Sequence, residues 1–221
     1  MNYQNAEDLQ SSFDSACALV YEAFPKQISG DWMSDQFGTC GLYISHGARL
    51  SRHFKNYHIP GQKNSLSGSQ KFIDLMANCG RYLMEIGDYE TSLRLVQSGQ
   101  IACGDNINTL SYAKLCMVAG ADYYEQNKIT ECRKNYEIFH RIQEKLLHEN
   151  DLEQRANTLH SIHYAYGNIE YEKKNWHAAL LAYKTCLKIA LAKTPIHPIT
   201  ASAYYSLGCV EFELKHNDVA V

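Results

Sequence analysis

The sequence contains few of the features that build turn-rich β-structures or span a membrane. It has only four prolines and 13 glycines among 221 residues, which argues against a β-sandwich. It has no run of about 18 apolar residues, so we expect no transmembrane helix. The net charge of −3 argues against a polybasic nucleic-acid arm. The 45% of hydrophobic residues is typical of a globular protein with a core.

The motifs of several enzyme classes are also missing. There is no P-loop pattern Gly-x-x-x-x-Gly-Lys-Ser/Thr, no His-Glu-x-x-His, no Gly-x-Ser-x-Gly and no dinucleotide fingerprint. His160 and His163 lie one helical turn apart, but no further ligand has suitable spacing, so a structural role is favoured over a metal site. We also expect no catalytic role for the loop residue His197. The sequence therefore predicts a protein without catalysis, metal or cofactor.

The cysteines do not form close pairs, because the nearest two, Cys103 and Cys116, are 13 positions apart. The full set is Cys17, Cys40, Cys79, Cys103, Cys116, Cys132, Cys186 and Cys209. They lie in helix-like patterns, so we interpret them as buried free thiols rather than disulfides. The polar, acidic start of the chain is unlike a signal peptide, and no Asn-x-Ser/Thr site occurs. These features predict a cytoplasmic protein.

A pattern centred on glycine occurs four times along the chain. The glycines are Gly80, Gly120, Gly167 and Gly208, separated by 40, 47 and 41 residues. Seven residues after each glycine comes a turn signal, and twelve after it a small residue. Sixteen after it, in the three complete copies, come Val96, Tyr136 and Tyr183. This spacing predicts helical hairpins in which the glycine of the first helix lets the second helix approach closely.

The order of these positions resembles the tetratricopeptide repeat (TPR), although the standard repeat has only about 34 residues. The longer units resemble the kinesin-light-chain type and the repeat arrays of fungal STAND (NLR-like) proteins. Residues 194–201, Thr-Pro-Ile-His-Pro-Ile-Thr-Ala, are similar to the His-Pro-x-Thr-Ala loop that joins such repeats. The resemblance implies an all-α, right-handed superhelical solenoid of antiparallel helix pairs. The nucleotide-binding (NB-ARC-type) module of the STAND family has no counterpart here.

The domain organisation follows from the repeats. Residues 1–58 are expected to form an N-terminal hairpin, with helices over 7–24 and 35–57. Residues 59–70 form a Pro/Gly/Ser-rich linker, and the TPR array covers 71–221. The predicted repeats are about 72–108, 112–149, 155–193 and a truncated 199–221. Extra residues between 150 and 165 predict a longer loop or an extended helix. The fourth repeat stops 13 residues past Gly208, so we expect an exposed apolar end that self-associates or frays.

The resemblance further implies that certain positions of each first helix line a concave groove. The candidate binding residues are Arg81, Glu85, Tyr124, Glu125, Tyr164, Asn168, Tyr171, Glu172, Tyr205, Phe212 and Glu213. They form a row of glutamates and an aromatic stripe, which suits an extended or helical peptide carrying Lys or Arg. The alternative interpretation is that glutamate is simply a good helix former and the aromatics fill space between repeats.

The function expected from this resemblance is that of a non-catalytic scaffold or sensor array for protein–protein interaction. Its partner would be a protein or peptide, with no nucleic acid and no membrane. The array would be part of, or derived from, a fungal STAND/NLR-like signalling protein. Two alternatives remain open: a cargo adaptor of the kinesin-light-chain type, and the accessory TPR region of an enzyme whose catalytic part is absent.

Overall fold

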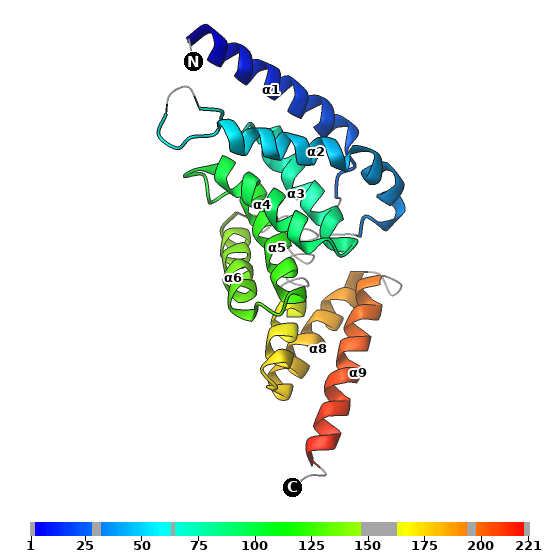
Figure 1. Cartoon of the computed structure of the whole chain (residues 1–221). Coiled ribbons are helices and arrows are strands. Elements are labelled where there is room, and N and C mark those ends of the chain that lie inside the picture. Colours follow the sequence, from blue (N-terminus) through cyan, green and yellow to red (C-terminus); the bar gives the residue numbers. More distant parts are fainter. Residues whose placement is uncertain (1–2, 28–31, 63–64, 147–162, 194–197, 219–221) are drawn as a thin grey trace. The chain divides into compact units, whose positions relative to one another are not determined.

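A computed structural model describes residues 3–27, 32–62, 65–146, 163–193 and 198–218 (Figure 1). Every regular element within these ranges is a helix, which confirms the all-α prediction. The elements are α1 (Tyr3–Ala23), a 3-10 turn η1 (Ser34–Gln36), α2 (Phe37–Tyr57), α3 (Gln70–Glu85), α4 (Tyr89–Cys103), α5 (Leu110–Glu125), α6 (Ile129–Leu146), α8 (Trp176–Lys193) and α9 (Pro198–Asp218). Residues 163–172 are also helical.

The chain divides into two compact units, residues 1–142 and 143–221. In the first unit, α1 packs on α2 and α3, and α2 also contacts α4, so the predicted N-terminal hairpin shares a core with the first repeat. The two predicted N-terminal helices are confirmed by α1 and by η1 with α2. The predicted extra segment between 150 and 165 lies largely outside the described residues, as do His160, His197 and the last three residues.

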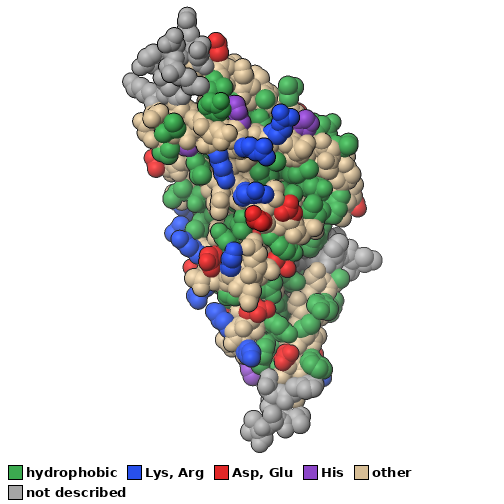
Figure 2. All heavy atoms as spheres, viewed as in Figure 1, with side chains coloured by type: hydrophobic (Ala, Val, Ile, Leu, Met, Phe, Trp, Pro, Cys, Tyr) green, Lys and Arg blue, Asp and Glu red, His purple; other side chains and the backbone are tan. Residues whose placement is uncertain are grey.

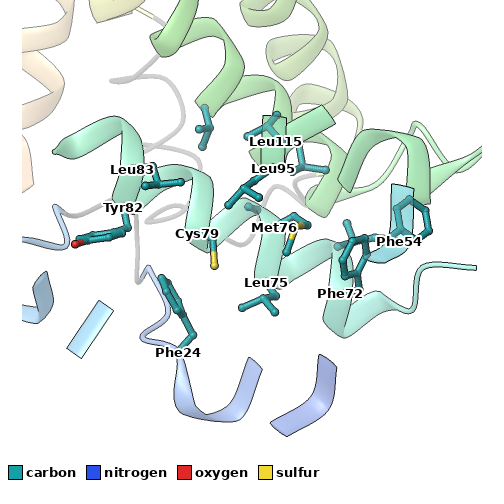
Figure 3. Close-up of a cluster of buried hydrophobic side chains, with 14 of the residues drawn as sticks. Phe24, Phe54, Phe72, Leu75, Met76, Cys79, Tyr82, Leu83, Leu95 and Leu115 are labelled. Atoms are coloured by element: carbon teal, nitrogen blue, oxygen red, sulfur yellow. The ribbon is translucent and has the colours of Figure 1, made fainter. Parts of the chain in front are cut away.

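The core of the first unit is built along α3. The ring of Phe72 lies 5.3 Å from that of Phe13 and 4.8 Å from that of Phe54, which joins α1, α2 and α3. Figure 3 shows Met76 of α3 on the side of Leu95 of α4 and Leu115 of α5, whereas Leu75 and Cys79 of α3 extend toward Phe24, and all of these side chains are buried. These contacts remove large apolar surfaces from water, and that burial is the main force holding such helices together.

The three complete sequence repeats have the same turn. Seven residues after each glycine the backbone takes a left-handed φ, at Gly87 (+85°), Asn127 (+56°) and Lys174 (+60°). In each turn, that residue donates its N–H to the carbonyl three positions earlier, and the next residue donates to the carbonyl five positions earlier. This Schellman-type pattern satisfies the last carbonyls of the first helix before the second begins.

The three glycines before these turns each lie close to the side chain found sixteen positions later in the sequence. A Cβ placed on Gly80 would meet Val96 at 2.7 Å, one on Gly120 would meet the ring of Tyr136 at 3.2 Å, and one on Gly167 would meet the ring of Tyr183 at 2.4 Å. Each neighbour is sixteen residues further along, as the repeat predicts. At Gly208 no atom among the described residues lies within 4 Å of such a Cβ.

The thiols are buried, as the sequence predicts, except that Cys209 is only partly buried. No disulfide joins the described cysteines, all of which are free. Burial raises the pKa of the Cys17 and Cys186 thiols to about 12 and that of Cys103 to about 11. Thiols with such pKa values are poor nucleophiles, because the thiolate is the reactive form. Among the described helices, none is long and apolar enough to span a membrane.

Candidate functional site

The first two candidate residues, Arg81 and Glu85, are engaged within the chain. Arg81 Nε forms an ion pair with Glu85 Oε1, and the Glu85 side chain is 0% exposed. The other oxygen, Oε2, accepts a hydrogen bond from the backbone N–H of Met33 at 2.7 Å. The Arg81 guanidinium lies 5.4 Å from the centre of the Trp32 ring. Both charged groups are thus in contact with Trp32 and Met33, which precede α2.

The described residues of the connection between α1 and α2, 24–27 and 32–33, contact the C-terminal half of α3. Gln27 donates its backbone N–H to Asn78 Oδ1 at 3.0 Å, and the side chains of Phe24 and Met33 are almost fully buried. Phe24 meets the edge of the Tyr82 ring, with 6.4 Å between ring centres. Sequence reasoning missed these contacts because they join residues about 50 positions apart. The apolar pair Trp32-Met33 within a loop was the only local sign.

In the second repeat the two candidates lie on the last turn of α5. Tyr124 is half-buried and Glu125 is exposed. The pKa of Tyr89 in α4 is raised above its ordinary value. Burial is the main cause, and the negative charges of Glu125 and Asp122 add to it. Glu85 and Glu125 belong to the first unit, and Glu172 and Glu213 to the second, so the predicted acidic row is divided between the two units.

Two candidates of the third repeat take part in packing. Asn168 Oδ1 accepts a hydrogen bond from the Tyr183 hydroxyl at 2.7 Å. The Tyr164 ring lies 5.8 Å from the Tyr183 ring, and its hydroxyl accepts from Ser206 Oγ at 3.4 Å. These contacts connect residues 163–172 to α8 and α9. Tyr164 and Asn168 are partly buried and take part in packing within the second unit. Glu172, in contrast, is exposed.

Four candidates are brought together in the second unit. Tyr171, Tyr205, Phe212 and Glu213 line one hollow, together with Tyr204, Gly208 and Cys209. Its volume is about 370 Å³, and it is open to solvent rather than enclosed. Tyr205 is 75% exposed and Phe212 is 60% exposed, so most of their ring surface faces solvent. Figure 2 shows hydrophobic side chains with an acidic one among them along the α9 part of the visible face. We call this feature the aromatic hollow.

The residues that shape the aromatic hollow are positioned by ordinary helix packing. Tyr171 is held by an edge contact with Trp176, with 5.1 Å between the ring centres. Leu207 and Val210 of α9 pack toward α8, and this turns Tyr205, Gly208 and Phe212 outward. Because glycine has no side chain, Gly208 leaves space between the flanking aromatic residues. The hollow therefore lies on the face of α9 opposite to the one that packs toward α8.

The charged side chain among the described residues that line the aromatic hollow is acidic, that of Glu213. The pKa of Tyr171 is raised above its ordinary value, first by burial and then by Glu213, Cys209 and Glu172. The phenol therefore stays neutral at physiological pH, and the nearby formal charge comes from the glutamates. Among the described lining residues there is no lysine or arginine. This arrangement favours a ligand that carries a positive charge.

A further polar residue, Asp122, was missed by sequence reasoning. It is fully buried on α5, and its Oδ2 lies 2.6 Å from Ser92 Oγ of α4. Ser92 Oγ also lies 2.9 Å from the carbonyl of Gly80 in α3, so three helices meet at this point. Burial is the main cause that raises the Asp122 pKa to about 8; Asp88 also raises it and the Ser92 bond opposes the rise.

The described residues contain no group of three or more His, Cys, Asp or Glu side chains that could hold a metal ion. No model of a known protein family matches the sequence, and no curated protein matches it significantly. The arrangement of the candidate residues must therefore carry the functional argument.

Proposed function

We propose that the chain is a TPR-like array of helical hairpins, stacked as a right-handed solenoid, that binds a peptide or protein partner without catalysing a reaction. Two repeated features support the hairpin unit: the left-handed residue seven positions after the glycine, and the packing contact sixteen positions after it. Units of equal local geometry that bury their faces against each other are the basis of a solenoid.

The observation that carries the binding proposal is the aromatic hollow. Aromatic side chains are enriched at the centres of protein interfaces, yet Tyr204, Tyr205 and Phe212 are exposed. A partner that covers these rings removes apolar surface from water, which favours binding. With Glu213 at the same place, the partner segment that fits best carries a lysine or arginine next to apolar residues.

A screen of short, unmodified random peptides tests this proposal. We expect enriched peptides to be basic and to bind the variant Tyr205→Ala/Phe212→Ala at least tenfold more weakly, about 1.4 kcal/mol. The matched control is Leu181→Ala, because Leu181 is an exposed α8 side chain outside the lining of the hollow. If the enriched peptides bind the double variant as tightly as the unmodified chain, the hollow is not the binding site.

In a cell, the proposed role is that of a cytoplasmic sensor or scaffold array of the STAND/NLR-like type, which rests on the sequence resemblance alone. The test is to fuse the array to a nucleotide-binding module of that class and to measure whether a hollow-binding peptide alters nucleotide exchange. A fusion that binds the peptide with unchanged exchange would argue against the sensor role and leave peptide binding intact.

A further inference from the structure

The composition of the aromatic hollow is more specific than that of a general peptide groove. Four aromatic residues, Tyr171, Tyr204, Tyr205 and Phe212, line a volume of about 370 Å³ with one carboxylate, that of Glu213. Aromatic rings carry a negative face and attract cations within about 6 Å of the ring centre. Several rings along one open hollow, with an acidic group among the lining residues, offer an organic cation both ring faces and a charge of opposite sign.

We propose that the aromatic hollow binds a methylated lysine side chain of a partner peptide. This inference rests on the proposed peptide-binding function and assigns the ligand of that site. The trimethylammonium group would fill the space that Gly208 leaves open, between the aromatic residues, and the charge of Glu213 would favour the cation over a neutral group. The neighbouring peptide residues would follow the exposed face of α9.

The chemistry of the lining favours a methylated amine over an unmodified one. A primary ammonium is strongly hydrated and has three N–H donors, which need acceptors when water is removed. Apart from the tyrosine hydroxyls, the side chains that line the hollow offer one carboxylate. A trimethylated ammonium has no N–H donor, so it loses less hydration on entry and places apolar methyl groups against the rings.

Three forms of one peptide provide the test, with the full-length chain as the binding protein. The peptides are identical except at the central residue, which is lysine, trimethyllysine, or a neutral isostere with carbon in place of the charged nitrogen. Binding is measured by isothermal titration calorimetry. We expect trimethyllysine to bind about tenfold more tightly than either of the other two peptides. Equal affinity for trimethyllysine and the neutral isostere would overturn the cation site, and tighter binding of unmodified lysine would overturn the assignment to a methylated side chain.

Substitutions then locate the site. Tyr205→Leu and Phe212→Leu keep an apolar side chain but remove the ring, and we expect each to abolish most of the preference for trimethyllysine over the isostere. Tyr205→Phe keeps the ring and is expected to keep the preference. The control Leu181→Ala should behave like the unmodified chain. Since both aromatic residues are largely exposed, these variants are expected to fold, and the helical circular dichroism signal verifies this.

The outcome separates this inference from the general function. If unmodified basic peptides bind through Tyr205 and Phe212 but methylation gives no advantage, the proposed function holds and the methyl-lysine assignment is wrong. If trimethyllysine is preferred equally by the ring-deleted variants, binding occurs elsewhere and the hollow is excluded for both.

Discussion

Replacing Asp122 by asparagine is expected to stabilise the first unit at neutral pH. Ser92 has one hydroxyl proton but two short contacts, with the Gly80 carbonyl and with Asp122 Oδ2. If Ser92 donates to the carbonyl, the proton in the other contact comes from the carboxyl group. Asp122 Oδ1 has no hydrogen-bond partner among the described residues, which a buried carboxylate would tolerate poorly. A protonated acid fits this site, and an asparagine amide can donate in its place.

The magnitude follows from the pKa of about 8, compared with 3.8 for an ordinary aspartate. Between these values the folded state keeps a proton that the unfolded state has lost, so stability falls as pH rises. Each pH unit costs about 1.4 kcal/mol, or on the order of 4 kcal/mol by pH 7. The asparagine variant does not pay this cost. Its advantage in unfolding free energy over the unmodified chain is expected to grow by about 3 kcal/mol between pH 5 and pH 7.

Urea unfolding at several pH values measures this difference. In a Trp176→Phe background, Trp32 is the only tryptophan, and it lies in the first unit with Asp122. Asp8→Asn is the matched control, since it makes the same change of charge at an exposed position of α1. Its stability should follow the unmodified chain at every pH. A difference between the Asp122→Asn variant and the unmodified chain that stays constant from pH 5 to pH 7 would refute the argument, because it would mean that Asp122 is ionised in the folded protein.

Three other predictions concern packing and reactivity. Gly167→Ala is expected to destabilise the second unit by about 1–3 kcal/mol, because the new methyl group overlaps the Tyr183 ring. Gly208→Ala should stabilise the same unit by up to about 1 kcal/mol, because the space there is open and alanine favours a helix. Thermal unfolding of the two variants compares these effects. Met33→Ala should cost roughly 2–5 kcal/mol in urea unfolding, because the side chain is almost fully buried, and a cost near zero would argue against the observed connection. With a thiol reagent at pH 8, Cys209 should react within the folded chain, while Cys17 should react only after urea is added; equal rates would contradict the burial pattern.

The local repeat could be predicted from the sequence because its signals are short-range. A glycine, a turn seven residues later and a larger side chain sixteen residues later lie within one hairpin. The structure has the turn in place and brings the glycine and the later side chain together at Gly80, Gly120 and Gly167. The helical periodicity likewise predicted α1 and α2. These features depend on spacing along one or two helices, which a sequence displays directly.

The candidate site was predicted only in part, because its outcome depends on tertiary contacts. Arg81 and Glu85 have positions in their helix similar to those of residues around the aromatic hollow, yet residues of a distant loop contact them. Tyr164 and Asn168 turn into the packing around Tyr183. The sequence suggests that Asp122 faces solvent, because its burial depends on a contact with Ser92 of α4. Each of these differences arises from a partner far away in the chain, which periodicity does not reveal.

The contact between each of these three glycines and the residue sixteen positions later limits which substitutions the two positions can accept during evolution. The two positions share one space, so a larger residue at one requires a smaller one at the other. Val96 meets one glycine and tyrosines meet the next two, which shows that the space differs from hairpin to hairpin. Substitutions at these positions should therefore occur in linked pairs.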